Sequence, residues 1–201
     1  MSDKGILMVI SGPTGSGKGQ IIKELVKKNK DLYLSVSSTT REKKEGDIEG
    51  LSYNFLTRQD FFKKVEQGAF LEWAEIYGNY YGTPKHIIRK KLKEGTNVIL
   101  ELDIKGALQV KEAYEDAVFV FILPSSIEAL KARIKESNKI ETTESLTRKF
   151  NSAYQEITSI SKYNYGVVAN NIDEAVSKIE SIILAEGLRV DRVKDEILEL
   201  K

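Results

Sequence analysis

The 201-residue sequence contains no cysteine, one histidine, one tryptophan and only three prolines. The absence of cysteine excludes both a disulfide framework and a thiolate metal site. No apolar run approaches the ~20 residues that span a bilayer, and no signal peptide is visible. The net charge of +1 gives no reason to expect nucleic acid or a membrane surface as a partner. We therefore expect a globular, cytoplasmic protein that builds its own hydrophobic core.

A glycine-rich segment follows the first apolar run of the chain. Residues 6–10 (ILMVI) have the composition of a buried strand, and residues 12–18 (GPTGSGK) fit the phosphate-loop pattern G-x-x-x-x-G-K. Glycines in such a loop let successive backbone N–H groups turn toward one point, the lysine adds a positive charge, and the next helix presents its positive end. The segment predicts a site for a nucleotide polyphosphate. The alternative is a glycine-rich turn that binds no ligand.

Strand-like and helical patterns alternate along the chain, which is typical of an α/β fold with a mainly parallel sheet covered on both faces. The expected strands are residues 6–10, 32–37, 98–103, 118–123 and 165–168. The expected helices are residues 20–30, 104–114, 126–135, 145–160 and 172–186. Because ligands bind at the carboxyl ends of parallel strands, the phosphate loop and Asp103 are predicted to face one cleft.

Three segments depart from this alternation. Residues 38–95 carry short strand signals at 53–57 and 70–76 and predict an insertion that holds a second substrate. The polar stretch 136–143 separates two helical patterns, and we expect it to form the tip of a mobile lid. The amphipathic tail 187–201 either packs on its own domain or serves as a dimerisation arm, so a monomer and a homodimer both remain possible.

Four segments together are highly specific, although each is common on its own. They are residues 35–41 (SVSSTTR), 68–75 (GAFLEWAE), 78–83 (GNYYGT) and 100–107 (LELDIKGA). In this order the sequence resembles guanylate kinase, a family of phosphate-loop nucleoside monophosphate kinases, over nearly the whole chain. The resemblance implies a single domain, 1–201, with a phosphate-loop parallel-sheet core (about 1–37, 95–125 and 153–201), a mixed α+β GMP-binding subdomain (about 38–94) and a short helical lid (about 126–152).

The resemblance also implies roles for residues of the predicted insertion. Arg41, Tyr53 and Tyr81 would hold the GMP phosphate, since a guanidinium and phenol O–H groups donate to its oxygens. Glu72 would accept from guanine N1–H and the 2-amino group. Adenine lacks both donors, and acceptors left unpaired in a buried site discriminate strongly. The whole set implied to bind GMP is Ser37, Arg41, Lys44, Tyr53, Glu72, Tyr81, Thr83, Glu101 and Asp103.

For the donor side, the resemblance implies ATP with Mg²⁺. The residues expected to bind ATP are Gly12, Pro13, Thr14, Gly15, Ser16, Gly17, Lys18, Gly19 and Gln20. Asp103 would hold the metal, directly or through water. The residues expected to act in catalysis are Lys18, Arg41, Arg133, Arg148 and Lys149.

Five positions depart from the family pattern, four of them on the donor side. Gln20 replaces a hydroxyl residue of the phosphate loop. Lys44 replaces the second arginine of the GMP phosphate site. The region 136–139 lacks a lid arginine. A further lid arginine falls on Lys149, beside Arg148, and an asparagine near the adenine falls on Ala169.

An arginine that stabilises a transferring phosphoryl group can contribute ~10³–10⁵ in rate, so the missing lid arginines matter. Lysine could substitute with lower efficiency, Arg133 and Arg148 could act instead, or the alignment could be shifted by one residue. We favour the second account, because Arg148 adjoins the expected position.

The predicted function is the ATP-dependent phosphorylation of GMP, and of dGMP as well, to the diphosphate. One alternative is a catalytically weakened relative that binds phosphorylated peptides or nucleotides through the same site. Another is a kinase for a different nucleoside monophosphate or a phosphorylated sugar, which Glu72, Ser37 and Thr83 disfavour.

Overall fold

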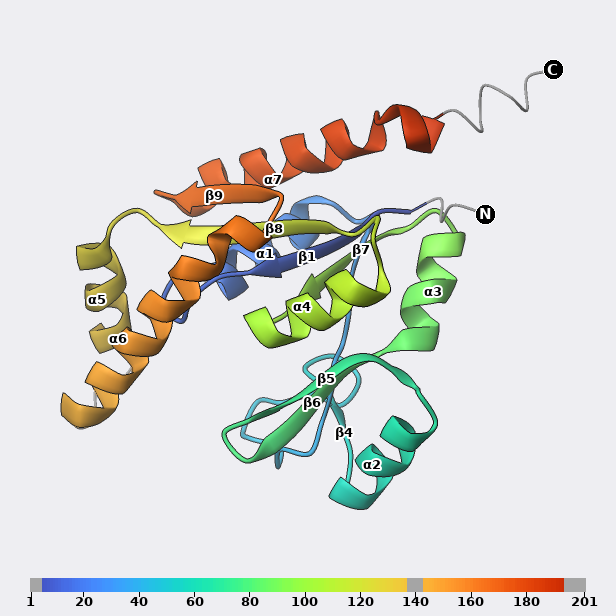
Figure 1. The fold of residues 1–201 in the computed structure, drawn as a ribbon, viewed down its shortest axis with the longest axis horizontal. Helices are drawn as coiled ribbons and strands as arrows, with labels where there is room; N and C mark the ends of the chain where they lie inside the picture. The colour runs from blue at the N-terminus through green and yellow to red at the C-terminus, as the bar shows by residue number, and fades with distance from the viewer. Residues whose placement is uncertain (1–4, 137–142, 194–201) are drawn as a thin grey trace.

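The computed structural model describes residues 5–136 and 143–193, whose core is a five-stranded parallel sheet (Figure 1). The strand order is β2-β7-β1-β8-β9, and every neighbouring pair is parallel. The strands are β1 (Leu7–Ser11), β2 (Leu32–Leu34), β7 (Asn97–Glu101), β8 (Val118–Pro124) and β9 (Tyr165–Ala169). The expected α/β class with a phosphate-loop parallel sheet is confirmed.

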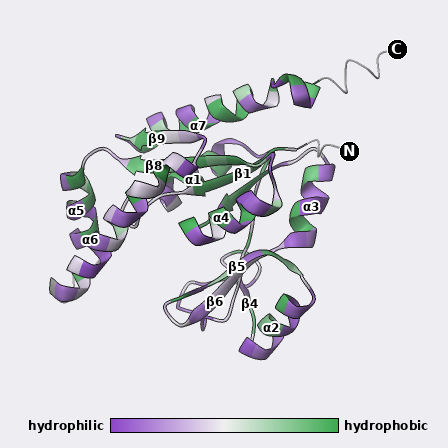
Figure 2. Cartoon of the chain, in the orientation of Figure 1, coloured by the Kyte–Doolittle hydropathy of each residue, from purple (hydrophilic) through white to green (hydrophobic). Residues whose placement is uncertain are grey.

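Helices cover both faces of this sheet. The helices that pack on it are α1 (Lys18–Lys28), α3 (Lys85–Lys93), α4 (Ile104–Ala113) and α7 (Ile172–Gly187). Because side chains alternate along a strand, Met8 and Ile10 pack on the face covered by α1 and α7, whereas Leu7 and Val9 pack on the face covered by α3 and α4. Figure 2 shows the resulting apolar strands between helices whose outer sides are hydrophilic. The carboxyl ends of these buried strands carry the candidate site.

A second, four-stranded sheet lies below the first in Figure 1. Its order is β4-β3-β6-β5, with β3 and β4 parallel and the other pairs antiparallel. Its elements are β3 (Ser38–Thr39), β4 (Asn54–Phe55), α2 (Arg58–Glu66), β5 (Phe70–Ile76) and β6 (Asn79–Pro84). The strand expected over 32–37 ends at Leu34, because the chain crosses here from the main sheet to the second one.

Two helices form a separate unit beside the carboxyl end of β8. They are α5 (Ile127–Glu136) and α6 (Thr143–Ile157), followed by the 3-10 helix η1 (Thr158–Lys162). Leu130, Ile134 and Ala153 are buried between them. The helix expected over 145–160 therefore changes to 3-10 geometry at its end. Most of the polar stretch expected as a lid tip, residues 137–142, lies outside the described residues.

The last described part of the chain follows α7. Leu188 and Val190 are exposed, and Arg192 donates from Nη2 to the Asp116 carbonyl at 3.0 Å. Residues 194–201 lie outside the described residues, so the choice between a packed tail and a dimerisation arm stays open. No helix among the described residues is long and apolar enough to cross a membrane.

Candidate active site

The phosphate loop joins β1 to α1 and has the backbone shape of an anion cradle. Gly15 and Gly17 have φ angles of +86° and +85°, which a side chain rarely tolerates. A Cβ on Gly12 would lie 2.6 Å from the Ile122 carbonyl, so this position also needs glycine. Lys18 is the first residue of α1 and stands at the positive end of the helix. The loop is therefore built to receive an anion, as the sequence predicts.

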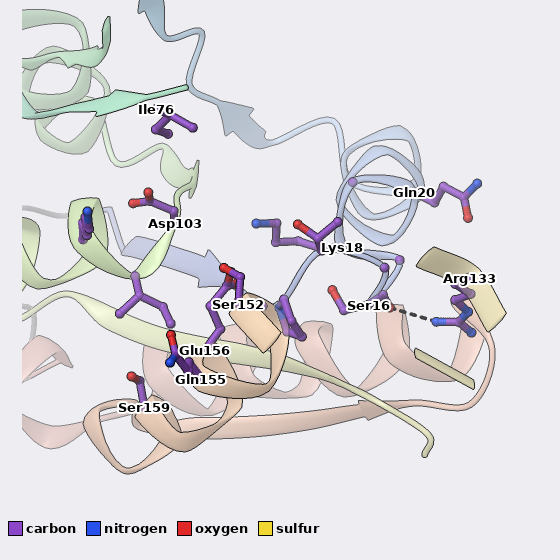
Figure 3. Close-up of a pocket in the computed structure, with 18 of the residues that line it drawn as sticks. Ser16, Lys18, Gln20, Ile76, Asp103, Arg133, Ser152, Gln155, Glu156 and Ser159 are labelled. Carbon is purple, nitrogen blue, oxygen red and sulfur yellow. Dashed lines mark hydrogen bonds between the residues drawn. The ribbon is translucent and has the colours of Figure 1, made fainter. Parts of the chain in front are cut away.

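The loop opens into a cavity of about 1230 Å³ (Figure 3). Its other walls are the start of α4, the helices α5 and α6, and the tip of the β5–β6 hairpin. Arg133 of α5 donates from Nη1 to the Ser16 carbonyl at 3.0 Å, which ties the helix pair to the loop. This places Arg133 beside the cradle, where a cationic group would meet bound phosphates.

Lys18 and Asp103 stand at the centre of the site. Figure 3 shows the Lys18 side chain directed toward Asp103. Lys18 Nζ lies 4.0 Å from Oε1 of Glu101 at the end of β7. Asp103 caps α4 through a bond from Gly106 N–H to Oδ1 at 2.8 Å, which leaves its second oxygen for another partner. Cation, carboxylates and phosphate loop thus share one edge of the sheet.

The donor set around Asp103 fits a magnesium ion. Among the described residues there is no group of three or more histidine, aspartate or glutamate side chains that could hold a metal by themselves. Mg²⁺ commonly takes one or two carboxylates, phosphate oxygens and water, and the single Asp103 carboxylate beside a phosphate cradle suits that chemistry.

Gln20, which replaces the expected hydroxyl residue, is exposed and points away from Asp103 in Figure 3. The residue that does face the acidic side of the site is Gly19, whose added Cβ would lie 3.7 Å from Glu101 Oε1. The side chain at position 20 is thus remote from the carboxylates in this structure.

A second cavity of about 710 Å³ adjoins the first. Lys18, Ile76 and Asp103 line both, so the two cavities meet where a group could pass from one ligand to the other. The predicted residues that line the second cavity are Ser37, Tyr53, Glu72, Tyr81, Glu101 and Asp103. They come from both sheets, which explains why they are scattered along the sequence.

Glu72 on β5 is the deepest ionisable group of the second cavity, with 5% of its surface exposed. The Thr83 hydroxyl on β6 donates to Glu72 Oε1 at 2.6 Å. Burial raises the pKa of Glu72 to about 7, although the bond from Thr83 opposes the shift. A buried carboxylate suits a ligand that presents N–H donors.

Tyr53 and Tyr81 also line this cavity, and Arg41 packs against Tyr53 without lining the cavity itself. The Arg41 guanidinium lies 5.2 Å from the centre of the Tyr53 ring, and the Tyr53 and Tyr81 rings meet edge to face at 5.8 Å. Burial raises the pKa of the Tyr53 phenol, which therefore stays a hydrogen-bond donor. One guanidinium and two phenols gather the donors that a phosphate group needs.

Asp47 is a partner of Arg41 that the sequence analysis missed. Its Oδ2 lies 2.9 Å from Arg41 Nη1 and accepts from the Lys44 backbone N–H at 2.8 Å. The guanidinium beside it lowers the pKa of the Asp47 carboxyl. The Lys44 side chain itself is exposed. The sequence between Arg41 and Tyr53 predicts a loop, but it does not show which acidic residue of that loop pairs with Arg41.

The helix α6 carries both candidate lid cations. Arg148 is exposed and lies 3.7 Å from Glu144, one turn earlier. Neither Arg148 nor Lys149 lines the cavity. The cavity residues Ser152 and Gln155 of α6 follow Arg148 by four and seven positions, which is the spacing of a single helix face. Lys149 is half-buried, and Ala153, one turn later, is buried against α5. The helix thus presents Arg148 on the same face as the cavity residues.

Two other groups on the cavity wall were also missed. Glu156 of α6 is half-buried, and burial raises the pKa of its carboxyl while nearby Lys18 opposes the shift. Tyr77, at the tip of the β5–β6 hairpin, is 89% exposed and has a φ of +49°. The Gly78-Asn79 pair signals the turn, but only the fold shows that the hairpin tip lines the same cavity as the phosphate loop.

Comparisons with known proteins agree with this geometry. A family profile described as guanylate kinase matches residues 4–186. The guanylate kinase of Clostridium acetobutylicum is 55% identical over 201 residues, with 100% of this chain and 95% of the relative covered. That of Clostridium perfringens strain SM101 is 54% identical over 200 residues, with 100% and 92% covered.

A solved structure leads to the same result. The crystal structure of guanylate kinase from Anaplasma phagocytophilum matches with a TM-score of 0.81 and 28% identity, and the match covers 100% of this chain and 97% of that one. With the phosphate loop, the paired cavities and these likenesses in agreement, the chain belongs to the guanylate kinase family, as its motifs predicted.

Proposed function

We propose that this chain transfers the γ-phosphoryl group of ATP to GMP, with dGMP as a second acceptor, and releases ADP and the guanosine diphosphate. The observation that carries the proposal is the pair of adjoining cavities, one opened by the phosphate loop and the other holding the buried Glu72–Thr83 pair. The bond to the donor's bridging oxygen breaks as a phosphate oxygen of GMP takes its place, so the reaction needs two anionic sites in contact.

The second cavity would recognise GMP at both ends. Glu72 would accept from N1–H and the 2-amino group of guanine, with Ser37 and Thr83 near the O6 and N7 edge. Arg41, Tyr53 and Tyr81 would hold the phosphate, assisted by Lys44, and Glu101 would help to orient the nucleotide. Because Glu72 is buried, a base without those N–H donors leaves it unpaired, and the enzyme should reject adenine.

The first cavity, lined by residues 12–20, would bind ATP mainly through the backbone N–H groups of that loop, to which Pro13 contributes none. Lys18 and Arg133 would face the phosphates, and Asp103 would hold Mg²⁺ directly or through water. When bound, the metal neutralises phosphate charge during transfer. Arg148 would add a positive charge from the lid as it closes, with Lys149 in a lesser role.

Closure of two mobile parts would complete the site. These are the GMP-binding subdomain, about 38–94, and the lid, about 126–152, which move on the core formed by the remaining residues. Since water competes with GMP for the phosphoryl group, closing both parts over the reactants favours transfer over hydrolysis.

Two further points complete the proposal. We expect the enzyme in the cytoplasm, where ATP and GMP are found, as a monomer or a homodimer. The relatives described above carry the name of the enzyme, which gives no support to the alternative of a binding module without activity.

Steady-state phosphoryl transfer from ATP with Mg²⁺ tests the proposal, with GMP, AMP, CMP and UMP as parallel acceptors. We expect turnover in the usual kinase range, ~1–100 s⁻¹, that is confined to the guanine nucleotide. GMP binding without turnover would favour the binding module instead, and comparable turnover of AMP would overturn the role of Glu72.

A further inference from the structure

The first turns of α4 connect the donor side of the site with the guanine end of the acceptor side. Asp103 caps the helix, Gly106 lies one turn on, and Gln109 lies one turn beyond that. Positions three apart are neighbours on a helix surface, so these residues form a continuous row. Asp103 and Glu72 already have proposed roles, whereas Gln109 has none.

Gln109 binds the backbone of Trp73 on β5 with both ends of its amide group. Its Nε2 donates to the Trp73 carbonyl at 2.9 Å, and the Trp73 N–H donates to its Oε1 at 3.3 Å. Among the described residues β5 is an edge strand of the second sheet and pairs with β6 alone. The side-chain amide therefore satisfies backbone groups that an additional strand would otherwise occupy.

Trp73 directly follows Glu72, at a point where the strand pairing is irregular. The register of β5 with β6 shifts between Phe70 and Trp73, so the ladder gives Glu72 no regular partner. Such an irregularity disrupts the ladder locally and changes the direction of nearby side chains, so a contact beside it can fix that direction. The clamp from Gln109 supplies that contact one residue from the carboxylate.

Gly106 shows how closely the helix and the carboxylate fit. A Cβ at this position would lie 2.8 Å from Glu72 Oε2, nearer than real contacts allow. The Glu72 carboxylate is therefore held between Thr83 on β6 and the backbone of α4. Its place relative to Asp103 depends on α4 as much as on the second sheet.

We propose that Gln109 is a positioning residue for guanine recognition, which fixes the Glu72 carboxylate against α4 by clamping the backbone of Trp73. The inference rests on the proposed role of Glu72 in binding GMP. Because Gln109 acts on the acceptor side alone, its loss should weaken the use of GMP and leave the use of ATP nearly unchanged.

The variant Gln109→Met tests this, since methionine has a similar length and removes both hydrogen bonds. We expect the KM for GMP to rise by about tenfold, while the KM for ATP and kcat change by less than about twofold. Glu112→Gln, at an exposed position on the same helix, is the matched control and should change neither constant. A melting curve of each variant shows whether it folds. Equal rises in the two KM values would overturn the proposal.

Combining Gln109→Met with Glu72→Gln separates this inference from the proposed function. If Gln109 acts through the carboxylate, adding Gln109→Met to Glu72→Gln should raise the KM for GMP by less than about twofold more. An undiminished tenfold effect in the double variant would show that Gln109 acts by another route, and the inference would be wrong. If Glu72→Gln by itself left the KM for GMP unchanged, the role of Glu72 would be wrong, and this inference with it.

Discussion

The two halves of the site bind their ligands by different physical means. The cavity proposed for GMP is lined by side chains from two sheets, among them a buried carboxylate bonded to Thr83 at 2.6 Å. The Arg41 guanidinium, paired with Asp47 at 2.9 Å, packs against Tyr53 of its lining. The cavity proposed for ATP depends on the backbone shape of one loop and on side chains from the helices around it. Side-chain recognition demands particular residues, whereas backbone recognition tolerates substitution.

This contrast accounts for one of the departures expected from the family pattern, the one in the phosphate loop. Gln20 is exposed and directed away from Asp103. Backbone N–H groups of the phosphate loop do not depend on the side chain at that position. The buried position of Glu72 does not tolerate substitution in this way, because a buried polar group without a hydrogen-bond partner costs its full desolvation energy.

The largest predicted effect concerns the lid, and it tests the contrast between the two cavities. Arg148→Ala should lower kcat by ~10³ or more if Arg148 stabilises charge on the transferring phosphoryl group, whereas Lys149→Ala should cost less than about tenfold. The reason is that Arg148 shares a helix face with the cavity residues of α6. Single-turnover kinetics at saturating ATP and GMP measure both. Equal losses would mean that the donor side does not depend on this arginine in particular.

The acceptor side should respond to pH through Glu72, whose pKa burial raises to about 7. Below that pH the carboxyl holds a proton in the free enzyme and cannot accept from both guanine N–H groups, so GMP affinity should fall by up to about tenfold per unit from pH 7 to 5. Calorimetric titration with GMP measures this.

The GMP phosphate also gains a proton near pH 6, which requires a control for that titration. Glu72→Gln cannot change its charge, so this variant should retain only the part of the pH dependence that comes from the phosphate. Identical pH profiles for the two proteins would show that the acceptor cavity does not depend on the ionisation of Glu72.

A smaller effect is expected at the altered position of the phosphate loop. Gln20→Thr restores the hydroxyl residue of the family pattern, and turnover should rise by less than about tenfold, because the side chain at this position points away from Asp103. Titration of Mg²⁺ at saturating ATP measures any change in metal dependence. A larger rise would place the side chain at position 20 in the metal site. The donor cavity would then depend on particular side chains as strongly as the acceptor cavity does.

The smallest effect concerns the hairpin that extends from the second sheet to the donor cavity. Tyr77 has a φ of +49°, which glycine adopts more easily, so Tyr77→Gly should raise the free energy of unfolding by about 0.5 kcal/mol after the greater chain entropy of glycine is counted. Urea denaturation measures it, with Tyr77→Val expected to destabilise the protein. A rise in the KM for ATP in the glycine variant would show that the hairpin tip contributes to the donor site.

Local patterns were enough to predict the phosphate loop and the class of fold. The G-x-x-x-x-G-K spacing and the φ requirements of Gly15 and Gly17 are properties of a few consecutive residues. The motifs around Glu72 and Tyr81 were visible for the same reason. The clamp between Gln109 and Trp73 was not, since the two residues are 36 positions apart and neither is unusual in its own segment.

The sequence by itself determined the α/β class, the phosphate loop and the family, because strand and helix periodicity, glycine conformations and ordered motifs act over short stretches of chain. The tertiary structure alone decided that Glu72 is buried, that Asp47 turns back to Arg41 and that the β5–β6 hairpin reaches the donor cavity. Burial, and contacts between distant residues, arise only when separate elements pack. Burial raises the pKa of the Glu72 carboxyl, and the contacts with Thr83 and Gly106 fix its place beside α4.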